Sequence, residues 1–134
     1  MTPGICLALA IYFEARSEPV QGQIAVGQVI LRRVESPRYP NTICGVVWQP
    51  HQFSWTSDGK SDKPSDKSAY ATSRHVARYL LKYADKLHDF SEGSTHYFNP
   101  KLADPYWARS GRQTAKIGNH VFLTLTRGSR ERNI

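Results

Sequence analysis

The feature of this sequence that most constrains its fold is an apolar run near the start, residues 5–13, which ends in a carboxylate, Glu14. Thr2 is a favoured helix N-cap and Pro3 is favoured at the first helical position, so the run predicts a helix in the protein core. Glu14 shares a helix face with the apolar residues three, four and seven positions before it. The opening of the chain therefore predicts a core helix that carries one carboxyl group among apolar neighbours.

A carboxyl group in such surroundings is a candidate general acid. Desolvation favours its protonated form, and a general acid that works near neutral pH needs a proton to give. The alternative is a solvated Glu14, which is usual for a glutamate in the last turns of an amphipathic helix. Glu18 is a possible second carboxylate. If the helix continues, the two carboxylates repel and one pKa rises further, whereas if Pro19 ends the helix, Glu18 is free to bind Arg16 or a loop.

The length of 134 residues, 40% of them hydrophobic, predicts one globular domain over residues 1–134, with a flexible tail from about residue 128. The two cysteines, Cys6 and Cys44, have neither C-x-x-C spacing nor a neighbouring ligand, and no compact histidine motif exists. We therefore expect no metal and no cofactor. Two buried thiols in a reducing compartment are the default prediction, and one bridge between them is the alternative. Because a thiol buried in an apolar helix is inert, only Cys44 remains as a nucleophile for Cys/His chemistry.

The formal charge of +7 points to an anionic partner; nucleic acid, anionic lipid and bacterial cell-wall polymers all fit. No nucleic-acid fingerprint accompanies the charge, and no stretch approaches the length of a membrane span. We therefore expect neither a nucleic-acid partner nor stable membrane insertion. The first residues lack the basic leader and cleavage site of a secretory signal, which predicts a chain kept in the cytoplasm until something else releases it.

The rest of the chain predicts a helix-dominated α+β fold. Apolar residues recur at helical spacing from residue 20 to Pro37, and a third helix is expected from the N-cap Asp66 to about Leu87. The polar residues 57–64 between these helices predict an exposed loop. Two short strands are expected at residues 95–98 and 121–126, the second after a turn at residues 118–119.

Three segments outside the helices combine aromatic rings with hydrogen-bonding side chains, at residues 52–55, 96–99 and 106–109. Such mixtures suit a sugar, because a pyranose offers an apolar face for stacking and a rim of hydroxyl groups for hydrogen bonds. For each single ring, packing in the core is the alternative. The residues that we predict to bind substrate are Gln52, Phe53, Ser54, Trp55, His96, Tyr97, Asn99 and Trp107.

These segments belong to a longer series of blocks, at residues 12–18, 22–34, 39–49, 52–55, 95–97, 105–109 and 117–122. In residue type and order the blocks resemble the SleB-like family of cell-wall hydrolases, which includes spore-cortex-lytic enzymes and phage endolysins. The resemblance implies a lysozyme-like single domain, related to goose-type lysozymes and lytic transglycosylases, with a small β element. It also implies cleavage of peptidoglycan glycan strands between N-acetylmuramic acid and N-acetylglucosamine. We expect the enzyme to be a monomer that is released from the bacterial cytoplasm to the cell wall.

The first glutamate of the family's E-A-R-x-E motif corresponds to Glu14, so the resemblance makes Glu14 the catalytic residue. The chain departs from many relatives at His51 and Ser57, where they carry cysteines, and a crosslink there is therefore absent. Other relatives carry a histidine where this chain has Phe98, and we assign that position no role.

Glycosidases usually need two carboxylates, and here Glu14 is the one clear candidate. A lytic transglycosylase needs a single acid, which protonates the glycosidic oxygen and then removes the C6 hydroxyl proton, while the substrate's own N-acetyl group stabilises the reacting centre. We therefore expect a bacteriolytic endolysin that leaves 1,6-anhydro ends, and a leaderless lysin of this kind fits a phage origin. A hydrolytic muramidase, in which Glu18 or Asp58 activates water, is the first alternative. A non-catalytic basic module that binds cell wall or nucleic acid is the second.

Overall fold

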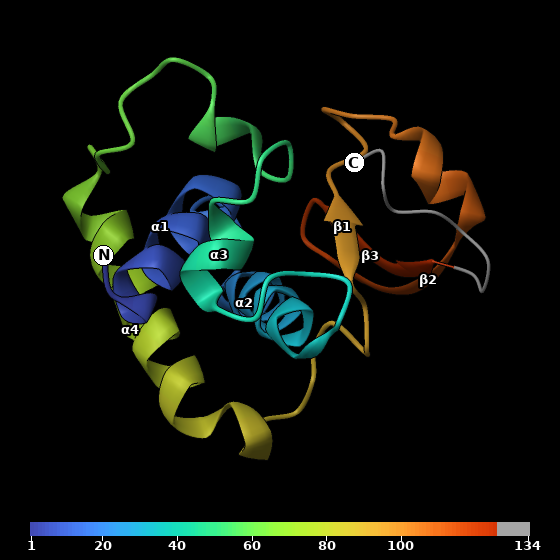
Figure 1. The fold of residues 1–134 in the computed structure, drawn as a ribbon, viewed down its shortest axis with the longest axis horizontal. Coiled ribbons are helices and arrows are strands. Elements are labelled where there is room, and N and C mark those ends of the chain that lie inside the picture. Colours follow the sequence, from blue (N-terminus) through green and yellow to red (C-terminus); the bar gives the residue numbers. More distant parts are fainter. Residues whose placement is uncertain (126–134) are drawn as a thin grey trace.

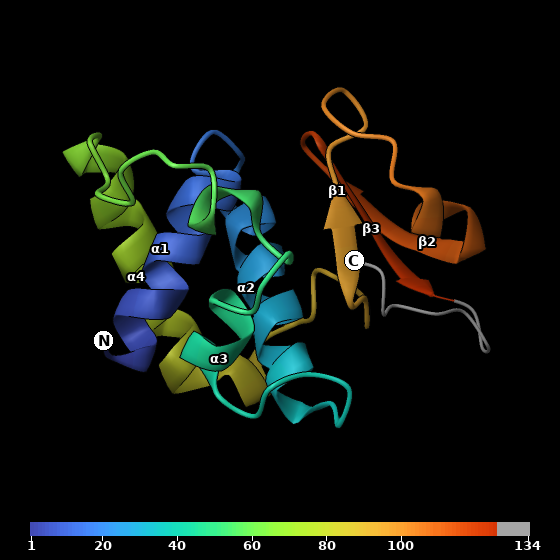
Figure 2. The ribbon, with the colours of Figure 1, turned by 45° about the horizontal axis from the view of Figure 1, so that its top comes forward.

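The computed structural model describes residues 1–125, which form a helical part and a small sheet lying side by side (Figure 1; Figure 2). The α-helices are α1 (Pro3–Ala15), α2 (Val20–Glu35), α3 (Ile43–Val47) and α4 (Lys67–Tyr83). Short 3-10 helices are η1 (Ser54–Thr56), η2 (Ala84–Lys86) and η3 (Tyr106–Ser110). Strands β1 (His96–Phe98), β2 (Gly111–Ile117) and β3 (His120–Leu125) pair antiparallel in the order β1-β3-β2. The helix-dominated α+β prediction is confirmed, whereas the tail expected to be flexible lies outside the described residues.

Helix α1 is the centre of the helical part, with α2, α3 and α4 packed around it (Figure 1). Thr2 caps its N-terminus by accepting a hydrogen bond from the Ile5 backbone N–H at 3.2 Å, and Pro3 is the first helical residue, as predicted. Residues 6–12 are at most 6% exposed. Full burial of one leucine or isoleucine side chain contributes about 1.5–3 kcal/mol, so this helix anchors the core and fixes the position of Glu14 at its end.

Helix α2 packs closely against α4 at Gly27, where a Cβ atom would lie 2.2 Å from Leu80 Cδ1. Because real Cβ atoms do not approach so closely, a larger residue here needs the buried side chain of Leu80 to shift. Helix α4 begins after its predicted N-cap, Asp66, which accepts a hydrogen bond from the Ala69 N–H at 3.0 Å. It ends at Tyr83, before the predicted end, because the chain continues there as η2.

The sequence did not predict two elements, α3 and β2. Helix α3 is a short turn of helix inside a polar stretch, capped by Thr42, whose hydroxyl accepts a hydrogen bond from the Gly45 N–H at 3.0 Å. Strand β2 exposes polar side chains such as Arg112 and Lys116, and its pairing with β3 shifts register between Gln113 and Ala115. Both elements form through contacts with their neighbours, so their own residue patterns carry little signal.

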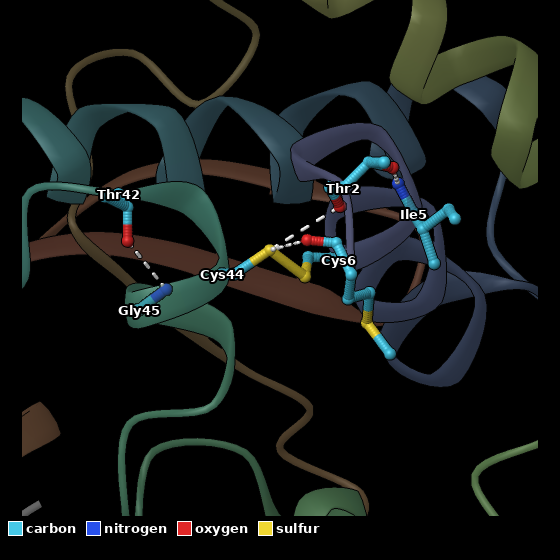
Figure 3. Close-up of a disulfide and its surroundings, with 7 residues drawn as sticks. Thr2, Ile5, Cys6, Thr42, Cys44 and Gly45 are labelled. Atoms are coloured by element: carbon cyan, nitrogen blue, oxygen red, sulfur yellow. Dashed lines mark hydrogen bonds between the residues drawn. A yellow bond between two sulfur atoms is a disulfide. The ribbon is translucent and has the colours of Figure 1, made fainter.

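A disulfide joins Cys6 of α1 to Cys44 of α3 (Figure 3). The two Cα atoms are 5.3 Å apart, and the sequence separation is 38 residues. The default prediction of two reduced thiols is therefore wrong, because the packing of α3 on α1 brings the side chains within bonding distance, which sequence spacing cannot reveal. In the chain-entropy account, closing a loop of this length stabilises the fold by about 4 kcal/mol. The bond fastens α3 to the helix that ends at the Glu14 site.

Candidate active site

Glu14 lies in the last turn of α1, and its side chain is partly buried. The hydroxyl of Tyr97, on β1, donates a hydrogen bond to Glu14 Oε1. Burial raises the pKa of Glu14, and although the hydrogen bond from Tyr97 and the charge of Arg33 lower it, the pKa stays above its usual value. Such a carboxyl group keeps its proton closer to neutral pH, as a general acid must.

Tyr97 connects Glu14 to the sheet. Its ring lies against two residues of β3, with ring centroids 5.1 Å from His120 and 5.7 Å from Phe122. Burial raises the pKa of Tyr97 well above its usual value, and the negative charge of Glu14 raises it further. Tyr97 therefore keeps its hydroxyl hydrogen and acts as a donor toward the carboxyl group.

A hollow of about 260 Å³ lies at this end of α1. Its wall combines the end of α1 and the α1–α2 link with the loop after β1 and the start of β3. The lining residues are Phe13, Glu14, Ala15, Arg16, Ser17, Glu18, Asn99, Leu102 and His120. Among the predicted substrate-binding residues, Asn99 lines this hollow and Tyr97 contacts its acid. Sequence reasoning did not single out His120 or Leu102; the first stands in the family block at residues 117–122, and the second, an exposed leucine, gave no signal.

Glu18, the possible second carboxylate, lies beyond the end of α1 and is only 7% exposed. Its two carboxylate oxygens accept hydrogen bonds from Asn119, Oε1 from the backbone N–H at 2.7 Å and Oε2 from Nδ2 at 3.1 Å. Asn119 belongs to the β2–β3 turn, so the alternative in which the helix ends first and Glu18 binds a loop is confirmed. Figure 2 shows the α1–α2 link and the β2–β3 turn at the same end of the molecule. Glu18 therefore fastens the helical part to the sheet beside Glu14.

Arg33 is a second link between the two parts and was missed in the sequence. It is 5% exposed, and its Nε donates to the Thr95 carbonyl oxygen at 2.9 Å while Nη1 donates to Gln52 Oε1 at 3.0 Å. Its guanidinium lies 4.8 Å from the ring centroid of Tyr39. The sequence could have indicated this role, because Arg33 lies on the apolar face of the second helix. A buried arginine is tolerated only when its guanidinium finds hydrogen-bond partners. Gln52, predicted to bind substrate, is held by this arginine.

The neighbouring aromatic residues of that segment belong to the core. Phe53 is 5% exposed and Trp55 is 6% exposed. Trp55 stacks on Phe13, with ring centroids 4.8 Å apart, and meets Trp48 edge-on at 5.2 Å. Phe53 and Trp55 therefore lie in the core, which agrees with the alternative of core packing, and neither residue lines the hollow. Ser54 is exposed.

His96 and Trp107 form a separate cluster on the other face of β1. The ring centroids of His96 and Trp107 are 4.8 Å apart, and those of Phe98 and Trp107 are 6.0 Å apart. Because side chains alternate along a strand, His96 and Phe98 point away from the face that carries Tyr97. Burial, helped by the charge of Arg33, lowers the pKa of His96 to about 3, so the imidazole is neutral. The structure does not bring this pair to the Glu14 hollow.

Within residues 1–125, no three His, Cys, Asp or Glu side chains come together in a way that could hold a metal ion. Nor does any helix in that range have the length and apolar character needed to cross a membrane.

Comparison with known sequences places these features in a family. The sequence model of the family described as Cell Wall Hydrolase matches residues 17–123, a range that begins just after Glu14. A spore cortex-lytic enzyme from Halalkalibacterium halodurans is 40% identical over 116 residues, covering 87% of this chain and 33% of the relative. The chain thus spans about a third of the length of this curated relative.

Two solved structures share the fold. The catalytic domain of the germination-specific lytic transglycosylase SleB from Bacillus anthracis matches with a TM-score of 0.72 and 34% identity, covering 92% of this chain and 96% of that one. The catalytic domain of the Bacillus cereus SleB protein matches with a TM-score of 0.69 and 34% identity, covering 91% and 90%. The expected fold, related to lytic transglycosylases with a small β element, is confirmed.

Proposed function

The chain belongs to the cell wall hydrolase family, and we propose that it cleaves the glycan strands of peptidoglycan between N-acetylmuramic acid and N-acetylglucosamine. The proposed reaction is that of a lytic transglycosylase, which leaves 1,6-anhydro ends. Glu14 is the proposed catalytic acid. The observation that carries this proposal is a partly buried carboxyl group with a raised pKa, placed in a hollow between the helical part and the sheet.

The geometry of Glu14 supports both halves of this reaction. Burial raises the pKa of the carboxyl group and so favours its protonated form, which can give its proton to the glycosidic oxygen as the bond from C1 breaks. The carboxylate that remains is stabilised by the hydrogen bond from Tyr97, and it can then take the proton of the C6 hydroxyl as that oxygen bonds to C1. The N-acetyl group of the substrate stabilises the centre between the two steps. One carboxyl group therefore suffices for the cycle.

Hydrolysis by a muramidase is the alternative, with Glu18 as the base that activates water. The nearness of Glu18 to the same hollow favours it, whereas the two hydrogen bonds from Asn119 leave its oxygens less able to hold a water molecule. The mass of the product distinguishes the two reactions, because a 1,6-anhydro end is lighter than a hydrolysed end by one water.

The deciding experiment is digestion of purified peptidoglycan followed by mass spectrometry of the released fragments. Both vegetative sacculi and spore cortex are suitable substrates, since the named relatives are cortex-lytic enzymes. We expect anhydro-muramic ends from the native chain and none from Glu14→Gln. Hydrolysed ends would favour the muramidase, and a folded Glu14→Gln protein that still cut the glycan would overturn the role of Glu14.

The proposal also covers the oligomeric state of the enzyme and the place where it acts. We propose a monomeric lysin, of phage or bacterial origin, that acts on the cell wall after release from the cytoplasm and needs no nucleic-acid partner. The charge of +7 favours accumulation on the anionic polymers of the wall. The Cys6–Cys44 disulfide suits a protein that works in an oxidising compartment. Gel filtration tests the oligomeric state, and wall binding that weakens with added salt tests the role of the charge.

A further inference from the structure

His120 is a titratable residue of the hollow that the proposed mechanism does not use. It is the first residue of β3 and is 6% exposed, and its ring meets the ring of Tyr97 edge-on, with centroids 5.1 Å apart. It lines the same hollow as Glu14. The other charged or titratable side chains around it are Glu18 from the α1–α2 link, Tyr97 from β1, and Glu14 and Arg16 across the hollow.

The two nitrogens of His120 have different surroundings. Nδ1 is buried, has no hydrogen-bond partner among the described residues, and lies 4.0 Å from Glu18 Oε1. Since Nδ1 is turned toward Glu18, Nε2 is the nitrogen that the hollow can reach. Burial lowers the pKa of His120, and the charge of Glu18, which acts in the opposite direction, does not offset this, so the ring is neutral near pH 7. A carboxylate 4.0 Å from Nδ1 favours the tautomer that carries its hydrogen on that nitrogen, and this tautomer leaves Nε2 as an acceptor.

Glu18 is held in place for this role by the β2–β3 turn. Asn119 donates two hydrogen bonds to its oxygens. Gly118 has a φ of +57°, and a Cβ atom there would lie 2.4 Å from Glu18 Oε1. A residue with a side chain at position 118 would therefore be strained and would also push the carboxylate away. The β2–β3 turn therefore holds the Glu18 carboxylate next to the imidazole of His120.

We propose that His120 is a further catalytic residue, whose Nε2 accepts a hydrogen bond from the acetamido N–H of the sugar at the bond that breaks, with Glu18 as its positioning residue. This inference rests on the proposed function. It gives the second glutamate of the E-A-R-x-E segment a role that differs from that of Glu14.

The reaction steps indicate why a hydrogen-bond acceptor is useful beside the acetamido N–H of the substrate. When Glu14 gives its proton to the leaving oxygen, the acetamido carbonyl oxygen closes on C1, and the positive charge that develops spreads to the acetamido N–H. The C6 oxygen then bonds to C1 as the bond from C1 to the carbonyl oxygen breaks, Glu14 takes the proton of the C6 hydroxyl, and the neutral acetamide is restored with its hydrogen still on nitrogen. The N–H donor is strongest when its charge is greatest. An acceptor backed by a carboxylate therefore stabilises the transition state more than the bound substrate.

Three substitutions of His120 test the proposal, with each variant's fold checked by its melting temperature. His120→Gln keeps an oxygen near the position of Nε2, whereas His120→Asn, the matched control, reaches only to the position of Nδ1. His120→Phe keeps the ring packing and removes the acceptor. We expect kcat to fall roughly a hundredfold in the Asn and Phe variants with KM little changed, and to be partly restored in the Gln variant. Equal activity of the Gln and Asn variants, or a Phe variant within about threefold of the native rate, would overturn the role of His120.

Two further measurements separate this inference from the proposed function. Nitrogen NMR of the histidine ring in the native protein is expected to show the hydrogen on Nδ1, and Glu18→Gln is expected to weaken that preference; a hydrogen on Nε2 in the native protein would contradict the proposal. Glu14→Gln is assayed in parallel. If Glu14→Gln is inactive while His120→Phe is fully active, the His120 inference fails alone; if Glu14→Gln is active, the proposed function fails.

Discussion

Two hollows on this protein are lined by carboxylic acids, and the contrast between Asp89 in one and Glu14 in the other shows what distinguishes a reactive site. The larger, of about 520 Å³, lies between α2, α4 and η2; its lining residues are Gln28, Leu31, Arg32, Glu35, Leu81, Ala84, Asp85, Leu87 and Asp89. The smaller, of about 260 Å³, contains Glu14. By volume alone, the first hollow would be the better candidate for an active site. The pKa of the acid instead favours the second, because the pKa of Glu14 is raised and that of Asp89 is lowered.

The partners of the two acids explain the difference. Burial raises the pKa of Asp89, but hydrogen bonds from Ser91 and Gly93 and the charge of Arg32 outweigh it, so its pKa is lowered. Arg32 forms a direct ion pair with Asp89. Glu14 accepts a hydrogen bond from Tyr97, which does not offset the effect of burial, and its pKa is raised. A carboxylate with an ion pair and several donors holds structure together, while one that is poorly compensated retains a proton to give.

Replacing each acid by its amide should separate the two roles most clearly. Glu14→Gln removes the proton donor, so the rate of peptidoglycan cleavage should fall by roughly a thousandfold or more. Asp89→Asn, the matched control, should leave the rate within about threefold, because its hollow has no part in the reaction. Turbidity loss of purified cell walls measures both variants. Comparable loss of activity in the two would remove the distinction between the hollows.

The hydrogen bond from Tyr97 sets how far the pKa of Glu14 is raised. It lowers that pKa, so Tyr97→Phe should raise it further and move the loss of activity at high pH to a higher pH. The maximal rate should fall by roughly tenfold, since the carboxylate formed in the reaction loses a donor. A pH profile of cleavage checks both effects. A profile displaced to lower pH would show that the hydrogen bond from Tyr97 does not lower the pKa of Glu14.

The two acids should also have opposite effects on stability as the pH changes. The pKa of folded Glu14 lies above its usual value of 4.5, so the stability linked to its protonation is present below that value and is lost as the pH rises through the folded pKa. Glu14→Gln should therefore be more stable than the native protein near pH 7, by about 1.4 kcal/mol for each unit of pKa shift, and should lose this advantage in acid.

For Asp89, whose pKa lies below 3.8, the linked stability is present above that value and is lost as the pH falls through the folded pKa. Asp89→Asn should therefore lower the free energy of unfolding by about 1–2 kcal/mol near pH 7, a modest value because the ion pair is a third exposed. The difference from the native protein should narrow in acid. Denaturant unfolding at pH 3 and pH 7 measures these effects, and parallel behaviour of the two variants would contradict the assignment.

Particular residues show how far the sequence could predict the site. The apolar run with Thr2 and Pro3 predicted α1 and therefore the position of Glu14, because capping and hydrophobic burial are local properties. Tyr97 and Asn99 were predicted as sugar contacts from their mixture of ring and amide groups, and both lie at the hollow or its acid. Phe53 and Trp55 came from the same kind of pattern but pack in the core, since an aromatic residue in a polar segment does not reveal which way its ring points.

The order and chemistry of the residues thus determined the core helix, the helix-dominated class and the resemblance to cell-wall hydrolases. Only the tertiary structure decided the disulfide between Cys6 and Cys44, the binding of Glu18 to the β2–β3 turn, and the burial of Arg33 between the helices and the sheet. The physical reason is the distance along the sequence over which each interaction acts. A helix cap or an apolar stripe acts within a few residues, whereas each of these contacts joins residues that come together only when the whole chain folds. The two glutamates in E-A-R-x-E have the same side chain in the sequence, and the surrounding fold gives one a raised pKa and the other two hydrogen bonds from Asn119.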